Sequence, residues 1–64
     1  MPVISVQMHS LETEKKKELI EKMTAAASEV TAIRPESFTI LIQELDQDNI
    51  GLGGKTLREV IASR

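Results

Sequence analysis

The chain has 64 residues and a formal net charge of −2, with no cysteine, one histidine (His9) and one aromatic residue (Phe38). Without cysteine it can form no disulfide or thiolate metal site, and a single histidine cannot build a structural zinc centre, so we expect no metal. The weak, mixed charge and the lack of aromatic side chains argue against a nucleic-acid partner.

The small size predicts that the single domain expected over residues 1–64 oligomerises. A domain of about 60 residues buries only about 60% of the surface of its unfolded chain, and its stability is marginal. Disulfides, a metal ion or oligomerisation usually supply the missing stability, and only oligomerisation remains here. Residues 1–5 contain no basic residue and no long apolar run. We therefore expect no signal peptide, no membrane association and a cytoplasmic protein.

The first two elements follow from a change in hydrophobic period. Residues 2–8 alternate between apolar and mostly polar side chains, which predicts a strand with Pro2 at its start. From Glu14 the period becomes helical, and Thr13 is the expected N-cap. The apolar positions of this helix are Leu19, Ile20, Met23, Ala26, Ala27 and Val30. Pro35 disfavours helical geometry in the residue before it, so the helix should end near Ala32.

The remainder of the chain predicts a strand, a tight turn and a short helix. Residues 37–45 alternate again, Gly51, Gly53 and Gly54 indicate a hairpin-like turn, and residues 56–62 favour a last helical turn or an extension. Strand, long helix and strand make one βαβ unit of the α/β (α+β) class with parallel strands. Two strands are too few for a stable sheet, so we expect a dimer to complete it.

Two short motifs imitate ligand-binding loops without their full residue sets. Residues 46–51 resemble the start of a calcium loop, but Ile50 and Leu57 stand where oxygen ligands are required. Residues 54–56 imitate the end of a phosphate-binding loop whose first glycine would have to replace Asn49. We interpret both as parts of the glycine turn.

Two polar residues at strand ends have a structural and a catalytic interpretation. His9 has no cysteine or second histidine to pair with, and a surface position is the more frequent role for such a residue. Glu44 closes the second predicted strand, where it could act as an acid or base. A structural hydrogen bond or an intersubunit salt bridge explains it equally well.

Several features together resemble the 4-oxalocrotonate tautomerase family over essentially the whole chain. They are the length, the single βαβ unit, the apolar strand from Pro2, the pair Leu19-Ile20, Glu44 at the end of the second strand, and the Gly-aliphatic-Gly-Gly turn of residues 51–54. The resemblance implies a small, cofactor-independent isomerase that exposes the amine of Pro2 as its catalytic base once Met1 is removed. Size favours at least a dimer, and the resemblance favours a hexamer.

The expected substrate is a small enol or keto acid, such as a 2-hydroxydienoate or an enol-pyruvate. Family members that act on diacids use two arginines, whose positions here fall at Glu12 or Thr13 and at Thr39. Thr39 is therefore a candidate substrate-binding residue, and so are Arg34, as a replacement cation, and the apolar Ile50 and Leu52. Lys55 is a second possible replacement. We expect weak activity on the diacid, and the alternative is a catalytically silent oligomeric or ligand-binding homologue.

Overall fold

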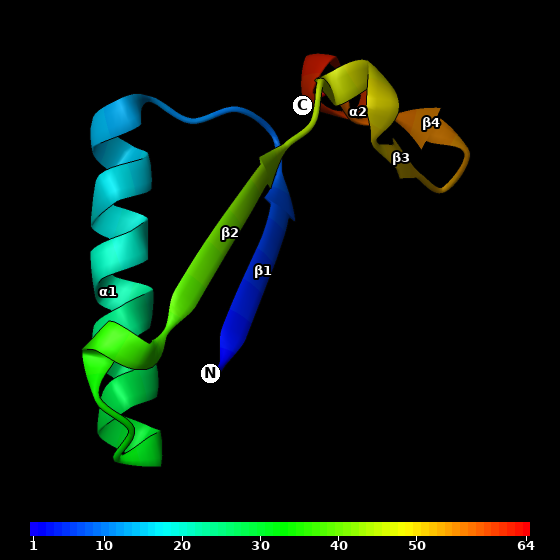
Figure 1. Cartoon of the computed structure of the whole chain (residues 1–64). Coiled ribbons are helices and arrows are strands. Elements are labelled where there is room, and N and C mark those ends of the chain that lie inside the picture. The colour runs from blue at the N-terminus through cyan, green and yellow to red at the C-terminus, as the bar shows by residue number, and fades with distance from the viewer.

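The computed structural model describes residues 1–64 and contains the predicted βαβ unit (Figure 1). Strand β1 (Val3–Met8), helix α1 (Thr13–Thr31) and strand β2 (Thr39–Glu44) follow one another. The two strands pair in parallel, from Val3 opposite Thr39 to Met8 opposite Glu44. The predicted fold class and the parallel pairing are confirmed. We refer to residues 1–45 as the body of the protomer.

Helix α1 covers one face of this two-stranded sheet and leaves the other face open. The even-numbered residues of β1 and the residue Pro2 before it are half-buried, whereas the odd-numbered residues are exposed. Ile42 borders the same surface hollow as Ile20 of α1, and Val6 pairs with Ile42 across the strands. On the opposite face Leu41 remains 53% exposed. The sheet thus presents an uncovered face on which Val3 and Leu41 are exposed among polar side chains.

Helix α1 begins and ends for local reasons that the sequence predicted only in part. Its N-cap is Glu12, in extended geometry, so the assignment of Thr13 as N-cap was wrong. Thr13 is instead the first helical residue, and the amide of Lys16 closes the first turn on the Glu12 carbonyl at 3.0 Å. The helix ends at the expected place, where Ala32 adopts the left-handed conformation. Arg34 before Pro35 is extended, as a residue before proline should be.

The apolar stripe of α1 is less covered than its spacing suggested. Leu19, Met23 and Ala27 are half-buried, but Ile20 is exposed and Val30 is 86% exposed. The 19 residues of α1 extend about 28 Å, whereas a six-residue strand extends about 20 Å. The last turn of α1 therefore runs past the sheet. Neither helix of the chain has the length and apolar character that crossing a membrane requires.

Residues 46–64 form an arm that projects from the end of the sheet, away from α1 (Figure 1). The arm contains the 3₁₀ turn η2 (Gln47–Asn49), strands β3 (Gly51–Leu52) and β4 (Lys55–Thr56), and helix α2 (Leu57–Ala62). The two short strands form an antiparallel hairpin. Gly53 and Gly54 occupy its turn with φ of +59° and +86°, which side chains disfavour. The predicted hairpin turn and final helix are confirmed.

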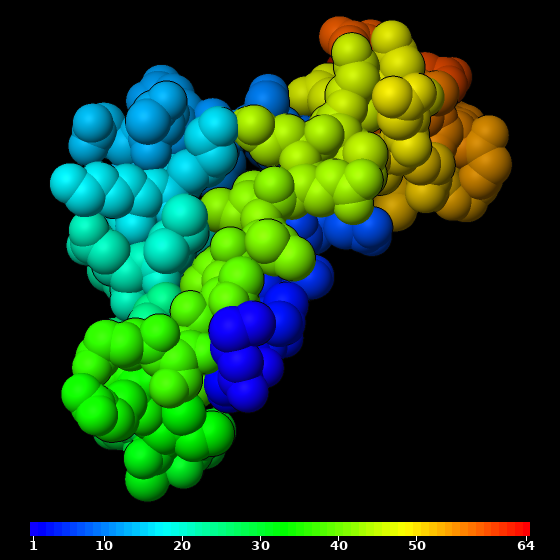
Figure 2. Space-filling view, in the orientation of Figure 1, coloured from blue at the N-terminus to red at the C-terminus, as the bar shows by residue number.

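The protomer has no core of its own. None of its residues is buried, and its accessible surface is 4990 Å². A compact monomer of 7.1 kDa would expose only about 4,100 Å². The radius of gyration is 14.9 Å, against about 11 Å for a compact chain of this length. The space-filling view in Figure 2 shows the arm standing clear of the body. The protomer therefore leaves the apolar side chains of the open sheet face and of the arm partly in solvent.

Candidate functional site

The amino-terminal end of the chain lies directly beside the first residue of β2. The Thr39 amide donates a hydrogen bond of 3.0 Å to the Pro2 carbonyl, which continues the β1–β2 ladder by one residue. The Thr39 hydroxyl lies 3.5 Å from the sulfur of Met1 and donates to it. Figure 2 shows the amino-terminal residues resting against the segment that leads into β2. The structure therefore brings two candidate site residues, Pro2 and Thr39, together.

Pro2 and Met1 differ sharply in how the fold holds them. Pro2 is half-buried and belongs to the same alternation as Ile4 and Val6, so its ring follows the side of the sheet that α1 covers. Met1 is 89% exposed, and the hydroxyl of Thr39 is its only side-chain hydrogen-bond partner. Removing Met1 would thus take away little packing and would leave Pro2 anchored through its carbonyl.

Arg34 lies on the segment before β2, but its charge is already paired. Its Nη2 atom lies 2.9 Å from a carboxylate oxygen of Glu36, and its side chain is 84% exposed. The pair sits in solvent, where such ion pairs contribute little. Arg34 is therefore near in sequence to Thr39, yet its guanidinium is occupied by a neighbour within the same turn.

The two apolar candidates, Ile50 and Leu52, lie in the arm. Ile50 is half-buried, and its carbonyl accepts a hydrogen bond of 2.7 Å from the Leu57 amide. Leu52 is 50% exposed and pairs with Lys55 across the hairpin. The arm and the amino terminus lie at opposite ends of the two-stranded sheet (Figure 1). One protomer therefore does not bring these residues to Pro2.

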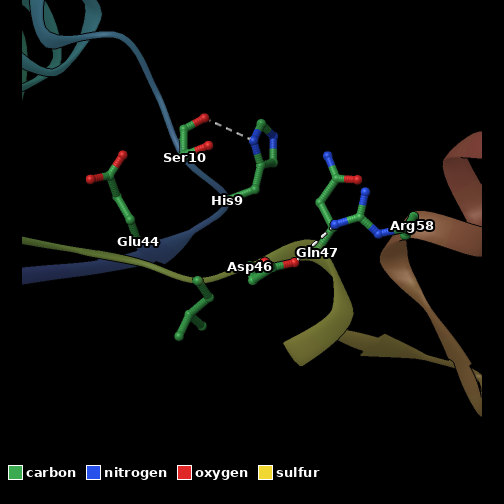
Figure 3. A pocket seen from close by; sticks show the side chains of 7 residues that line it. His9, Ser10, Glu44, Asp46, Gln47 and Arg58 are labelled. Atoms are coloured by element: carbon green, nitrogen blue, oxygen red, sulfur yellow. Dashed lines mark hydrogen bonds and ion pairs between the residues drawn. The ribbon is translucent and has the colours of Figure 1, made fainter.

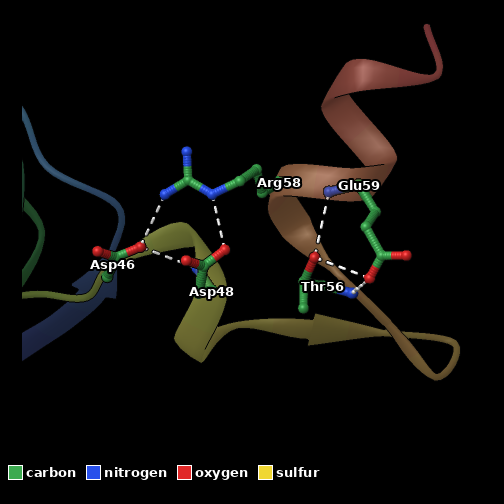
Figure 4. A network of polar contacts seen from close by, with 5 residues as sticks. All are labelled: Asp46, Asp48, Thr56, Arg58 and Glu59. Carbon is green, nitrogen blue, oxygen red and sulfur yellow. Dashed lines mark hydrogen bonds and ion pairs between the residues drawn. The ribbon is translucent and has the colours of Figure 1, made fainter.

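Polar contacts hold the arm in one shape (Figure 4). Arg58 of α2 places Nε 2.6 Å from Asp48 and Nη2 3.0 Å from Asp46. The amide of Asp48 also donates to Asp46 at 2.9 Å. Asp48, and then Asp46, raise the pKa of Arg58, while the Asp48 amide and then Arg58 lower the pKa of Asp46. Asp46 and Asp48, the two acids of the segment that resembles a calcium loop, are thus both bound by the guanidinium of Arg58.

The start of α2 carries a capping box, which fixes the hairpin against the helix (Figure 4). The Thr56 hydroxyl accepts from the Glu59 amide at 3.2 Å, and a Glu59 carboxylate oxygen accepts from the Thr56 amide at 3.0 Å. The bond from the Thr56 amide, and then one of 3.0 Å that the Thr56 hydroxyl donates to the same carboxylate oxygen, lower the pKa of Glu59. The capping box was not predicted with its helix, although the Thr-x-x-Glu spacing at residues 56–59 is typical of one.

Glu44 has a structural role within the protomer. Its two carboxylate oxygens accept from the Leu11 amide at 2.9 Å and from Lys16 Nζ at 3.0 Å. The Leu11 amide, followed by Lys16, lowers the pKa of Glu44. These bonds tie the loop before α1 to the end of β2. Of the two interpretations of Glu44, the structural one accounts for both of its oxygens.

A polar hollow lies where the body meets the arm (Figure 3), and it does not form a catalytic arrangement. Its lining includes His9, Glu44, Asp46 and Arg58. His9 Nδ1 lies 3.1 Å from the Ser10 carbonyl and donates to it. The carboxylates of the hollow are paired with cations or amides, and none of them contacts the imidazole. The hollow therefore offers no acid–base pair.

Comparisons with known proteins agree with this geometry. A sequence profile described as "Tautomerase enzyme" matches residues 2–59. A probable tautomerase of Bacillus cereus is 40% identical over 60 residues, which cover 92% of this chain and 98% of the relative. A 2-hydroxymuconate tautomerase of Bacillus subtilis is 34% identical over 61 residues, covering 94% and 98%. The crystal structure of TomN, a 4-oxalocrotonate tautomerase homologue of the tomaymycin biosynthetic pathway, superposes with a TM-score of 0.91 at 26% identity, covering 95% of each chain.

Proposed function

The chain belongs to the tautomerase family and is an isomerase, and we propose that it tautomerises small enol acids with Pro2 as general base. The substrates are of the 2-hydroxydienoate or enol-pyruvate type, and no cofactor takes part. The observation that carries this proposal is the placement of Pro2. Its carbonyl accepts a hydrogen bond from Thr39, the residue is half-buried, and the neighbouring Met1 is exposed.

The base is the secondary amine that removal of Met1 creates. An α-amino group has a reference pKa of about 8, and apolar surroundings disfavour its protonated form. A base with a pKa near the working pH is the most effective in general acid–base catalysis. The free amine takes the proton of the enol hydroxyl, the O–H electron pair forms the carbonyl π bond, and the C=C π pair moves onto the carbon that is to be protonated. The protonated amine then returns a proton to carbon, which completes the tautomerisation.

The other candidate residues give the site its shape. Thr39 lies next to Pro2 and offers a hydroxyl that, without Met1, is free to bind a substrate oxygen. Ile50 and Leu52 come from the arm of a neighbouring subunit and keep water from the amine. Arg34 could turn from Glu36 toward a carboxylate, and this requires breaking an ion pair that is weak in solvent.

The proposed assembly is a homo-oligomer of dimers, most simply a hexamer. Its support is the uncovered face of the sheet together with an arm that contacts little of its own body. In this assembly each site takes Pro2 and Thr39 from one subunit and Ile50 and Leu52 from another. We place the enzyme in the cytoplasm.

The test compares the parent protein with a Pro2→Ala variant. Intact mass first establishes that Met1 is absent, and ultraviolet assays then follow ketonisation of phenylenolpyruvate and 2-hydroxymuconate. We expect Pro2→Ala to lose about 100-fold or more in kcat, the usual range for a general base. The matched control is Pro35→Ala at the other proline, which should keep its rate. Full activity of Pro2→Ala would exclude the mechanism, and a parent without activity on either compound would exclude these substrates.

A further inference from the structure

The ion pairs of the protomer leave few cations free to bind an anionic substrate. Eight side chains are Lys or Arg. Five of them form ion pairs within 4.0 Å, namely Lys15, Lys16, Lys22, Arg34 and Arg58. The three that remain are Lys17, Lys55 and Arg64. Lys17 lies on α1 and Arg64 ends the chain, so Lys55 is the only unpaired cation on the hairpin that carries Leu52.

The hairpin geometry links the direction of Lys55 to that of Leu52. The two residues are direct partners on either side of the Gly53-Gly54 turn. Directly opposite residues of an antiparallel pair project from the same face, with Cβ atoms about 4.5–5.5 Å apart. Any surface that receives Leu52 therefore also receives Lys55. The ammonium stands at the tip of a four-carbon stem, so it can reach past the leucine toward a ligand.

The hairpin is also held firmly enough to aim a side chain. The two turn glycines hold positive φ angles, and the capping box fixes Thr56, the residue after Lys55. Arg58, one turn into α2, is bound to both Asp46 and Asp48. Lys55 itself takes part in none of these contacts. The hairpin is therefore ordered, while the charge of Lys55 is left without a partner.

We propose that Lys55 is the specificity-determining cation of the site: on the arm of a neighbouring subunit, it binds the carboxylate of a monoanionic enol acid at Pro2. This inference rests on the proposed function. Lys55 would be the one cation of the site that binds a carboxylate without first breaking an ion pair, since Thr39 is neutral and Arg34 is paired with Glu36. The enzyme should therefore favour a monoacid such as phenylenolpyruvate over the diacid 2-hydroxymuconate.

The first test separates charge recognition from a structural role. Lys55→Met removes the ammonium, Lys55→Arg retains the charge, and Lys17→Met is the matched control at the other unpaired lysine. Substrates are phenylenolpyruvate and its neutral methyl ester. We expect Lys55→Met to raise KM for the acid about 10- to 100-fold, the usual effect of losing a charge-assisted hydrogen bond, with kcat nearly constant. KM for the ester should not change, and Lys55→Arg should recover most of the acid's KM.

The second test does not depend on turnover. The four proteins are titrated with phenylpyruvate, the keto product, and binding is followed by NMR chemical shifts. The parent, Lys55→Arg and Lys17→Met should bind with similar Kd, and Lys55→Met about tenfold or more weakly. Equal affinities of the parent and Lys55→Met, or no binding by the parent, would overturn the assignment of Lys55. Failure of Pro2 as base appears separately, as full activity of Pro2→Ala, and leaves this titration valid.

Discussion

Truncating Leu41 tests whether the open face of the sheet is an interface. Leu41 lies in the middle of β2 opposite Ser5, on the face that α1 does not cover, and it is 53% exposed. If another subunit covers it, Leu41→Ala leaves a cavity and costs about 2–5 kcal/mol per subunit. If the face remains in solvent, the cost is below about 0.5 kcal/mol. The two free-energy costs differ by enough for thermal unfolding to distinguish them.

The assay is thermal unfolding at several protein concentrations, combined with sedimentation velocity. For a domain of this size each kcal/mol shifts Tm by about 4–8 °C, so the covered case predicts a fall of at least about 8 °C. It also predicts partial dissociation in the variant, and a Tm that rises with concentration in the parent. Leu41→Met should cost less than about 1.5 kcal/mol, and Lys17→Ala on exposed α1 almost nothing. If Leu41→Ala changes neither the oligomeric state nor the Tm, the reasoning is refuted.

Three further predictions concern the contacts of Glu44 with Leu11 and Lys16, and the arm. The pKa of Glu44 is lowered by the Leu11 amide and Lys16, so its stabilisation is present above the unfolded value of about 4.3 and is lost as pH falls through the folded pKa. In the Glu44→Gln variant, the free energy of unfolding measured with urea should fall less steeply as the pH is lowered below about 4.3. Gly54→Ala places a side chain at φ +86° with open space around it, so only the backbone resists, and we expect a loss of about 1 kcal/mol in thermal unfolding. Arg58→Met should speed hydrogen exchange of the Asp48 amide, and unchanged exchange there would contradict a role for Arg58 in holding the arm.

The parts of the fold that the sequence predicted are those set by local physics. Alternation over residues 2–8 gave β1 within one residue, because one face of each strand is covered and the other is not. Pro35 fixed the end of α1 through the geometry of Arg34. The glycines at 53 and 54 specified a hairpin because its two turn positions need positive φ.

The missed features depend on distances that a sequence pattern does not contain. The exposure of Val30 follows from α1 being longer than the sheet it covers, which only the three-dimensional arrangement shows. The contact between Arg58 and Asp48 spans ten residues and requires the hairpin to fold back first. Asp46 and Asp48 resembled calcium ligands, although Arg58, ten residues after Asp48 and twelve after Asp46, is the simpler partner for both.

The candidate site could be predicted as a set of residues but not as a place. Pro2 and Thr39 meet because the register of two parallel strands brings them together. Ile50, Leu52 and Lys55 lie at the other end of the same chain, and no single-chain property places them at Pro2. Their proposed link to the amine requires the packing of a second subunit.

The separation of Pro2 from the arm within one protomer connects the stability of the protein to its chemistry. A chain with no buried residue cannot exclude water from its own amino terminus, yet the proposed base needs apolar surroundings to be neutral at the working pH. The subunit that covers the open apolar surface would also bring the hairpin to Pro2, so one assembly supplies both the missing core and a dry site. Leu41→Ala should therefore reduce assembly and activity together. Lys55→Met should weaken recognition of a carboxylate and leave the assembly intact, which separates the architecture of the site from its selectivity.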